Sequence, residues 1–376
     1  MEITVTRQDL LKELTAIQSV VERKTTIPIL SNFLVEVTDG PEGGQINITA
    51  TDLDQAIRTS AKAKVKKAGS CTIPARKLYD YVKLLQDGEI SIKLLDNHWV
   101  QIRSGRSNTK MVGLGRANYP QVPELPTIAS VKIPVPVLKT LIARTIFSIS
   151  NEESRYTLNG ALLILKAESI AMVATDGHRL AQTKDDTIAE GNGKDVSAVV
   201  PIKAINLIER LLTDPEQTVS LQFKENKLFV QISSETGGVT ATMSTALVEG
   251  TFPPYGDVIP KDSDKKVTLN RDRFFSAVRR AALLTNEESK GVRLAFANGT
   301  LSISSRAPEM GEAKIDLPVE YAGEAIEIGF NPTYLMDALK VADQETVTFE
   351  MKTPNKPGLL KSGPGFLYVV MPVNLS

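Results

Sequence analysis

The sequence repeats one pattern three times, at intervals of about a third of its 376 residues. Val5 precedes an apolar helical stripe at Leu10, Leu14 and Ile17. The pattern returns 128 residues later as Ile133, Leu138 and Ile142, and 136 residues further on as Leu269, Phe274 and Val278. A second helical stretch recurs as IPARKLYDYVKLL from Ile73, VPIKAINLIERLL from Val200 and FNPTYLMDALKVA from Phe330. Repeats this long are whole domains and not the short units of a solenoid. The pattern therefore predicts three similar domains, and copies of one domain favour a rotationally symmetric assembly.

Two helices and several strands are expected in each repeat. The predicted helices cover residues 7–24, 73–87, 134–150, 201–214, 270–290 and 331–343. Strand-like runs such as FLVEV, ALLIL and VRLAF lie between the helices of a pair, and EISIKLL, TVSLQF and TVTFEM follow the second helix. Short turn signals, including Asn298-Gly299, are typical of antiparallel connections. The order predicts an α+β fold with the helices on one face of antiparallel sheets.

Proline-rich connections mark the expected boundaries. YPQVPELPTIAS and FPPYGDVIPKDSD separate domains at 1–126, 127–258 and 259–376. Unpaired sheet edges promote aggregation unless another strand covers them, and similar domains can cover them by pairing end to end. A turn of about 60° between successive domains would let two chains close head to tail into a ring with pseudo-sixfold symmetry.

Composition excludes some classes of protein. The chain is 42% hydrophobic and 23% charged, with 44 basic and 44 acidic residues, so it has no uniformly basic surface. The predicted helices hold 17 basic and 12 acidic residues, a net charge of +5 that leaves −5 elsewhere. The single cysteine, Cys71, excludes an intrachain disulfide. No stretch approaches the roughly 20 apolar residues of a membrane span, and the N-terminus is unlike a leader, so a cytoplasmic protein is expected.

Catalytic motifs are scarce. The chain has two histidines and no phosphate-binding loop or zinc motif, and we expect no catalytic residue, no metal site and no cofactor. The string ATDGHRLA permits one enzymatic alternative, a three-domain hydrolase that uses Asp176 and His178 as an acid and base pair. Its counterpart in the first repeat, ATDLDQA, lacks a histidine, which favours a structural turn.

Two further features suggest contacts with other molecules. The ending FLYVVMPVNLS is apolar and nearly uncharged, and it fits either a last core strand or a surface for a partner. Basic and aromatic residues lie near helix starts and loops: Arg23, Lys24, Arg76, Lys77, Arg155, Tyr156, Lys203, Arg279 and Arg280. Singly these are solvated surface groups, but together they are suited to phosphate contacts that do not read bases.

The sequence resembles the bacterial sliding clamps, the beta subunits of DNA polymerase III. The similar strings are RKTTIPILSNFL, IPARKLYD, RSGRS, ESRYTLNG, ATDGHRLA, FPPYGDVIP, LLTNEESKGVRL and YVVMP, in this order and over the whole chain. The resemblance implies a non-enzymatic homodimeric ring, with helices around a hole that holds duplex DNA. Such a ring tethers the replicative polymerase for processivity, and it recruits the clamp loader, repair polymerases and other proteins through short peptides. A weakly binding closed ring slides along DNA.

The resemblance also implies site residues. A groove for partner peptides would be formed by Leu158, Thr175, Gly177, His178, Arg179, Leu180, Pro253, Val258, Val369, Val370, Met371, Pro372 and Val373. The DNA contacts would be Lys24, Arg155, Tyr156 and Lys203. The dimer interface would include Lys77, Arg103, Arg106, Leu283, Leu284, Glu309 and Glu312.

Two departures from the family pattern affect these expectations. Gly256 and Asp257 replace a segment that often carries arginine, and Thr109 replaces an aromatic residue after RSGRS. The first bears on peptide preference and the second on interface packing. A monomeric peptide-binding scaffold without a DNA role is a further alternative, which the mass in solution would separate from a ring.

Overall fold

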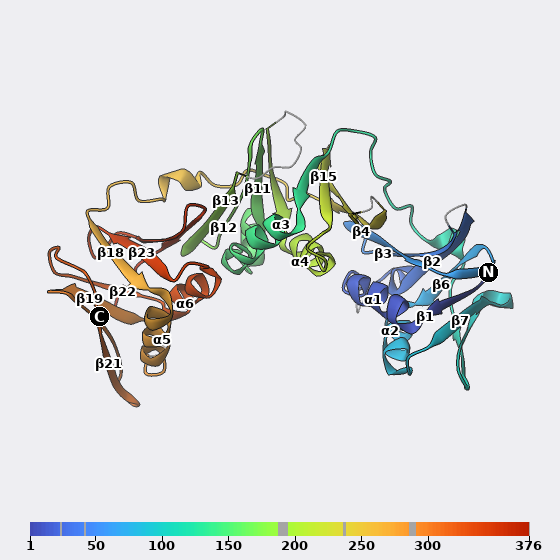
Figure 1. The fold of residues 1–376 in the computed structure, drawn as a ribbon, viewed down its shortest axis with the longest axis horizontal. Helices are drawn as coiled ribbons and strands as arrows, with labels where there is room; N and C mark the ends of the chain where they lie inside the picture. Colours follow the sequence, from blue (N-terminus) through green and yellow to red (C-terminus); the bar gives the residue numbers. More distant parts are fainter. Residues whose placement is uncertain (23–24, 41–42, 187–194, 236–237, 286–290, 376) are drawn as a thin grey trace. The chain divides into compact units, whose positions relative to one another are not determined.

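The computed structural model describes residues 1–22, 25–40, 43–186, 195–235, 238–285 and 291–375. Contacts between residues divide these into two compact units. Unit 1 draws on Met1–Pro136 and Lys203–Leu247, and unit 2 on Val137–Thr187, Gly193–Ile202 and Val248–Ser376. Figure 1 shows the chain coloured along its sequence. Each unit is described by itself.

All six predicted helices are present in the described residues. They are α1 (Arg7–Ile17), α2 (Ala75–Leu84), α3 (Val135–Ala143), α4 (Ile202–Leu211), α5 (Arg271–Ala282) and α6 (Pro332–Val341). Short 3-10 turns occur at η1 (Pro28–Ser31), η2 (Asp96–His98), η3 (Arg116–Asn118), η4 (Ile146–Ser148), η5 (Glu153–Leu158) and η6 (Tyr255–Asp257). No described helix is long and apolar enough to span a membrane.

All six helices end earlier than predicted, and three of them, α1, α3 and α5, end about two turns earlier. After α1 the backbone tightens, because the Val20 N–H bonds to the Ile17 carbonyl and the Val20 side chain turns into the core. α3 ends because the Thr145 hydroxyl donates to the Leu141 carbonyl at 2.7 Å, the acceptor that a continuing helix would use. At the end of α5, the Ser305 hydroxyl donates to the Ala281 carbonyl at 2.6 Å. Residues 286–290, where that helix was predicted to end, lie outside the described residues.

Unit 1 contains two antiparallel sheets. The first has the order β5 (Lys64–Lys67), β1 (Glu2–Thr6), β7 (Glu89–Leu94), β8 (Trp99–Ser104) and β9 (Ser107–Val112). The second has the order β10 (Val131–Pro134), β15 (Thr218–Lys224), β16 (Lys227–Ser233), β17 (Val239–Ala246), β4 (Gln55–Lys62), β3 (Gly43–Thr51), β2 (Asn32–Gly40) and β6 (Gly69–Pro74). The lysines of β5 keep that edge strand charged, which disfavours aggregation.

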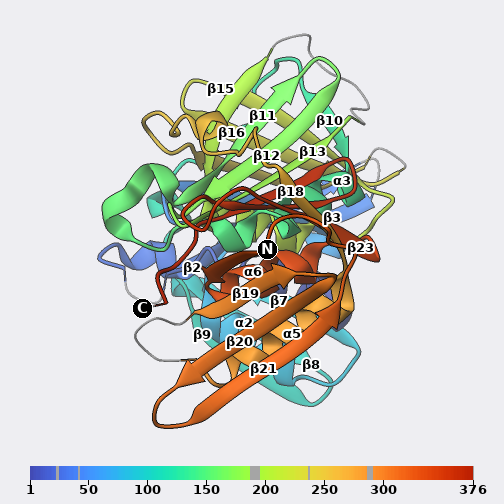
Figure 2. The same cartoon turned by 90° about the vertical axis from the view of Figure 1, so that its left-hand side faces the viewer.

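Unit 2 also contains two antiparallel sheets, and the smaller of them faces the viewer in Figure 2. The larger has the order β14 (Val196–Pro201), β11 (Gly160–Lys166), β12 (Ser169–Thr175), β13 (Arg179–Asp185), β25 (Phe366–Val370), β24 (Gly358–Ser362), β23 (Thr346–Met351) and β18 (Lys265–Asn270). The smaller has the order β21 (Gly311–Pro318), β20 (Thr300–Ala307), β19 (Val292–Ala297) and β22 (Ile326–Phe330). The predicted turn at Asn298-Gly299 joins β19 to β20, with both residues at positive φ.

Each eight-stranded sheet is completed by strands from two successive repeats. In unit 1, β17 of the second repeat pairs with β4 of the first, with Met243 opposite Ile57. In unit 2, β25 of the third repeat pairs with β13 of the second, with Tyr368 opposite Ala181. The expected end-to-end pairing of similar repeats is therefore confirmed within the chain.

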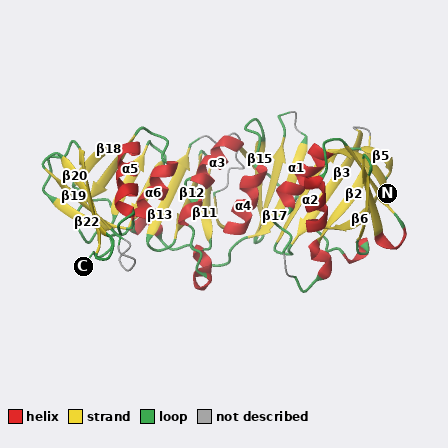
Figure 3. Ribbon diagram, turned by 90° about the horizontal axis from the view of Figure 1, so that it is seen from below, coloured by secondary structure: helices red, strands yellow, loops and turns green. Residues whose placement is uncertain are grey.

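The helices lie on one face of the sheets in each unit, as Figure 3 shows. α1 buries Leu10, Leu14 and Ile17, and α5 buries Phe274 and Val278, so most of each recurring stripe is the core-facing side of a helix. Ile133 and Leu269 are also buried, but they lie in the strands β10 and β18 that precede α3 and α5. The helices as the structure bounds them hold 13 basic and 6 acidic residues, a net charge of +7. The predicted positive bias of the helices is stronger over the observed ranges than over the predicted ones.

Candidate functional site

A cluster of apolar side chains covers one end of the larger sheet of unit 2. Leu180 of β13 lies opposite Val369 of β25, and both side chains are buried. The cluster, called the apolar cluster below, consists of Leu162, Val173, Leu180, Val199, Phe252, Leu359 and Val369, with Leu158, Ile164, Val248, Tyr255, Ile259 and Leu367 half-buried against it. Three of the predicted groove residues, Leu158, Leu180 and Val369, thus come together.

The turn between β12 and β13 lies at the edge of this cluster and is held by its own side chains. The Thr175 hydroxyl donates to the Arg179 carbonyl at 2.6 Å and accepts from the Gly177 N–H at 3.1 Å. The Asp176 carboxylate accepts from the backbone N–H groups of His178 and Arg179 at 2.9 and 3.0 Å. Gly177 has φ +88°, and a Cβ there would lie 2.7 Å from a guanidinium nitrogen of Arg155. The turn is therefore held in place by contacts within the chain.

Arg179 connects this turn to the C-terminal repeat. Its guanidinium, with a side chain 11% exposed, donates to Asp176 at 3.0 Å, to Asp337 at 2.8 Å and to the Phe147 carbonyl at 2.5 Å. It also lies over the rings of Tyr334 and Phe147, at 4.4 and 5.5 Å from their centroids. Burial alone would lower the pKa of Arg179, but the Tyr368 oxygen and the two carboxylates raise it. With its donors occupied, Arg179 stabilises the turn.

The same geometry argues against the hydrolase alternative. The Asp176 carboxylate is occupied by two backbone N–H groups and by Arg179, and His178 meets it through the backbone N–H. The first repeat builds the same turn without a histidine, since Asp52 accepts from the Asp54 and Gln55 N–H groups. The Thr-Asp sequence is a repeated structural turn, and the hydrolase interpretation is not supported.

The sequence left open whether the C-terminal segment is a last core strand or an exposed apolar surface, and the segment has a part of each kind. Val369 and Val370 are buried in β25, and Val370 packs into the core of the C-terminal repeat instead of the apolar cluster. Met371, Pro372 and Val373 are half-buried beyond the strand. The Met371 N–H donates to the His178 carbonyl and the Val373 N–H to the Gly329 carbonyl, each at 2.9 Å. The tail thus lies beside the turn, where its half-exposed side chains extend the apolar surface.

The segment around η6 adds further side chains beside the apolar cluster. Pro253 and Val258 are exposed, and the Phe252 and Tyr255 rings between them join the apolar cluster in an edge-to-face pair with centroids 6.3 Å apart. Phe252 and Tyr255 were not among the predicted site residues. The string FPPY carries both rings, and its aromatic content was the available signal.

The predicted DNA-contact residues are mostly solvated. Tyr156 is 62% exposed, and the Lys203 ammonium lies 3.8 Å from Glu22. Arg155 is partly engaged, because it pairs with Glu152 at 3.0 Å and donates to the Asp176 carbonyl at 2.9 Å. Lys24 lies outside the described residues.

The predicted interface residues lie near two of the unpaired sheet edges, those of β9 and β21. Lys77, Arg103 and Arg106 are exposed in the first repeat, near β9. In the third repeat Leu283 is 74% exposed and Leu284 is half-buried, while Glu312 in β21 and Glu309 just before that strand are exposed. Within the described residues, β9 pairs only with β8, and β21 only with β20.

The side chains of the described residues that could hold a metal ion or react as a thiol are not arranged or exposed for that chemistry. In the part of the chain that the structure describes, no group of three or more His, Cys, Asp or Glu side chains is placed to hold a metal ion. Cys71 is buried, and burial raises the pKa of its thiol to about 12.

Comparisons with known proteins agree along the whole chain. Models of the N-terminal, central and C-terminal domains of the DNA polymerase III beta subunit match residues 1–123, 132–254 and 256–374. The beta sliding clamp of Pseudomonas putida KT2440 is 37% identical, and that of Chlamydia pneumoniae 32%; this chain is covered completely, as are 100% and 99% of the relatives. A crystal structure of the Pseudomonas aeruginosa beta subunit superposes with a TM-score of 0.90 at 35% identity, with both chains fully covered. The Bacillus subtilis clamp structure gives 0.92 at 26% identity, also over both full chains. The chain belongs to the beta sliding clamp family, the beta subunits of DNA polymerase III.

Proposed function

We propose that two copies of this chain close head to tail into a ring around duplex DNA. The observation that carries this proposal is which strand edges are paired between successive repeats and which are left unpaired. β4 and β13 are counterparts in the first two repeats, and each pairs with the last strand of the following repeat. Their counterpart in the third repeat is β21, and the last strand of the first repeat is β9. β21 and β9 therefore correspond to the two members of the pairs β4–β17 and β13–β25, yet each has an unpaired edge within the described residues.

Repeat equivalence gives the proposed register of this contact. Thr109 of β9 is the counterpart of Met243 and Tyr368, because each lies opposite an equivalent residue of the preceding strand. Ala313 of β21 is likewise the counterpart of Ile57 and Ala181. Thr109 would therefore lie opposite Ala313 of the partner subunit, and Lys110 opposite the partner's Glu312. Exposed apolar side chains beside the two edges, including Leu84 at 84% and Leu283 at 74%, would be covered by the contact.

The proposed activity is topological and not catalytic. A closed ring cannot leave duplex DNA sideways, so it needs only weak, sequence-independent contacts with phosphates and can slide. The net charge of +7 on the observed helices suits a surface that faces DNA. Arg155, Tyr156, Lys203 and Lys24 are the proposed contacts. The sequence boundaries 1–126, 127–258 and 259–376 are proposed as the three domains of each subunit.

We further propose that the apolar cluster and its rim bind short peptides of the replicative polymerase, the clamp loader and repair polymerases. The half-buried tail at Met371–Val373, the fixed turn at Thr175–Leu180 and the exposed Val258 would contact apolar peptide side chains. Support comes from a Pseudomonas aeruginosa clamp structure, which is described as bound to griselimycin. With these partners the protein would act in the bacterial cytoplasm.

Two measurements test the ring. Sedimentation should give a mass near twice that of one chain, and the protein loaded by a clamp loader should stay on nicked circular plasmid but leave after linearisation. Equal retention on circular and linear DNA would contradict a topological mechanism, and a monomer at micromolar concentration would contradict the assembly.

A matched pair of variants tests the peptide site, with griselimycin as the probe in calorimetry. Val258→Glu places a charge on the rim, whereas Val239→Glu changes a side chain of similar exposure, 43% against 44%, far along the sequence in unit 1. We expect Val258→Glu to weaken binding at least about tenfold, since a charge facing an apolar ligand is costly. Val239→Glu should bind like the parent. Equal affinities in the two variants would remove the site assignment.

A further inference from the structure

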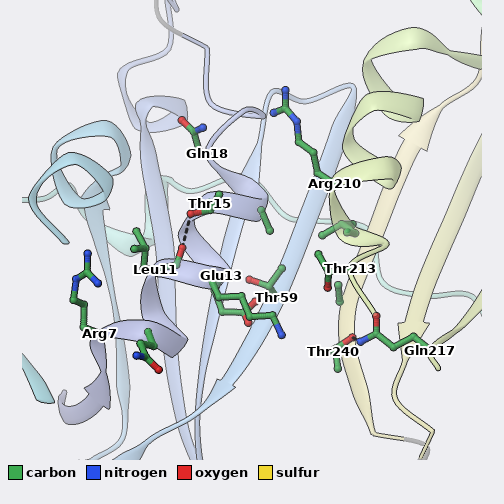
Figure 4. Close-up of a pocket in the computed structure, with 15 residues that line it drawn as sticks. Arg7, Leu11, Glu13, Thr15, Gln18, Thr59, Arg210, Thr213, Gln217 and Thr240 are labelled. Atoms are coloured by element: carbon green, nitrogen blue, oxygen red, sulfur yellow. Dashed lines mark hydrogen bonds between the residues drawn. The ribbon is translucent and has the colours of Figure 1, made fainter. Parts of the chain in front are cut away.

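Unit 1 contains a cavity that neither the family comparison nor the proposed ring explains. It has a volume of about 650 Å³ and lies between α1, β4, β17, the last turn of α4 and the segment that follows α4. Figure 4 shows Glu13 beside Thr59, with Thr213, Gln217 and Thr240 across the cavity. Leu11, Ala16, Leu211 and Ala241 supply the apolar part of the lining.

The equivalent position in unit 2 is filled by an arginine. Arg144 pairs with Asp343 at 2.7 Å and lies over the Phe366 ring, 5.6 Å from its centroid. The Arg144 side chain is only 12% exposed. At this junction a guanidinium, its carboxylate and an aromatic ring occupy the space between two repeats.

Repeat equivalence shows what unit 1 has in these places. The register of the first strands aligns Val5 with Ile133, which makes Ala16 the counterpart of Arg144. The last strands align Ala241 with Phe366, and the alignment of the second helices makes Thr213 the counterpart of Asp343. All three counterparts line the cavity. The cavity exists because three small side chains replace the arginine, the carboxylate and the ring.

Two buried polar atoms of the cavity make no hydrogen bond of good geometry within the described residues. The Gln217 side-chain carbonyl, on a residue 8% exposed, has no partner. The Thr59 hydroxyl, on a residue 1% exposed, has none of good geometry, although it lies near enough to Glu13 to lower the pKa of that carboxyl. The Gln217 amide nitrogen donates to the Thr240 hydroxyl at 3.4 Å, which leaves the carbonyl end free. Buried polar atoms without partners are rare and costly.

Glu13 adds a carboxylate where the other repeats are apolar. Its counterparts are Leu141 and Ala277, both buried in the core. Burial raises the pKa of Glu13, and the nearby Thr59 hydroxyl and Lys12 only partly offset this rise. A carboxylate kept at an unfavourable position is typical of a binding site, where stability is given up for function.

The neighbouring cations do not neutralise Glu13. The Arg7 guanidinium is held by Asp87 at 2.8 Å and by the carbonyls of Val82 and Lys83. The Arg210 side chain points away from Glu13 in Figure 4. Lys12 is exposed at the rim, where solvent and salt screen its charge.

We propose that this cavity binds an alkylguanidinium group, as carried by an arginine side chain of a partner protein or by a small guanidine. The planar fork of N–H donors suits the Glu13 carboxylate and the Gln217 carbonyl together, and the alkyl stem suits the apolar lining. The ligand would take the place that Arg144 fills in unit 2. The proposal does not depend on ring closure, since all its residues belong to unit 1.

Calorimetry on the full-length protein at low ionic strength tests the proposal. The probe is n-butylguanidinium, and its control is n-butylurea, which has a similar planar shape but no charge. We expect binding of the first and at least about tenfold weaker binding of the second, because an ionised hydrogen bond is stronger than a neutral one. Capped arginine, with its backbone blocked at both ends, distinguishes the sources. Its binding indicates a partner's side chain, and binding of n-butylguanidinium alone indicates a small guanidine.

Three variants locate the site. Glu13→Gln should weaken n-butylguanidinium binding at least about tenfold, whereas Glu216→Gln removes an exposed carboxylate outside the cavity lining and should bind like the parent. Ala16→Arg should fill the cavity with its own guanidinium and abolish binding, with circular dichroism to verify its folding. Absence of binding at millimolar probe, equal affinity for the urea, or unchanged affinity in Glu13→Gln would each overturn the proposal.

Discussion

Replacing Arg179 by glutamine tests the idea that this residue stabilises the junction between β13 and β25. The first repeat supplies the model for the change, because Gln55 is the counterpart of Arg179 and still donates to Asp52 at 3.1 Å. Arg179→Gln should therefore keep a contact with Asp176. It should lose the 2.8 Å bond to Asp337, the 2.5 Å bond to the Phe147 carbonyl and the stacking on two aromatic rings.

The expected cost follows from these contacts. Breaking a buried ion pair costs about 3–5 kcal/mol when its partner is left without compensation. Asp337 keeps an ion pair with Lys340 at 3.2 Å and is not left without compensation, so the loss of the pair itself should cost less than this range. Together with the lost stacking, we expect local stability to fall by about 2–3 kcal/mol.

Native-state hydrogen exchange measures this loss where it occurs. Unfolding of a multidomain chain is not two-state, so a single free energy of unfolding would be ill-defined. Backbone amides of β13 and β25 should exchange at least about thirtyfold faster in Arg179→Gln, which corresponds to about 2 kcal/mol. Arg293→Gln, which breaks the exposed pair with Glu327, should leave these amides unchanged. A double-mutant cycle with Asp337→Asn that gives a coupling below about 0.5 kcal/mol would refute the reasoning.

Three further changes give separate tests. Lys110→Glu should raise the dimer Kd about tenfold in sedimentation, and adding Glu312→Lys should restore it; a double variant no better than the single ones would contradict the register. Glu13→Leu should stabilise unit 1, because folding raises the pKa of the Glu13 carboxyl. The stability that Glu13 contributes is then fully present below about pH 4.5, the ordinary pKa of a glutamate, and is lost as the pH rises through the pKa of the folded state. The gain should be larger at pH 7.5 than at pH 4.5 by hydrogen exchange, and a pH-independent gain would count against a buried carboxylate. Ala16→Arg with Thr213→Asp should rebuild the arginine–aspartate pair of unit 2, and slower exchange in the double variant than in either single one is the expected sign.

Most of the fold was predictable because its signals are local and repeated. Helix faces such as Leu10, Leu14 and Ile17 bury their side chains as the spacing requires, and the Asn298-Gly299 turn follows from the freedom of both residues at positive φ. The short strands β1, β10 and β18 that begin each repeat were not predicted as strands. Each has only four to six residues and runs directly into a helix, so alternation alone does not separate it from the helix that follows.

The remainder depended on contacts between distant parts of the chain. The end of α3 is set by Thr145, whose hydroxyl competes with the backbone, and the end of α5 by Ser305 from another element. For the candidate site, the resemblance named the turn, the tail and the rim. It did not reveal that Arg179 is occupied by Asp337 or that Val370 faces away from the apolar cluster. Such facts follow from strand register and burial, which composition and spacing do not determine.

The two eight-stranded sheets have a consequence for anyone who divides the chain into pieces. The central repeat supplies β15–β17 to one sheet and β11–β14 to the other. A fragment that stops at residue 126 would strip β17 from β4 and bare a row of backbone donors and acceptors, and an excised central repeat would bare two such rows. Such truncated products should precipitate or pair with themselves during expression. The pieces that domain models delimit along the sequence are therefore poor choices for separate production.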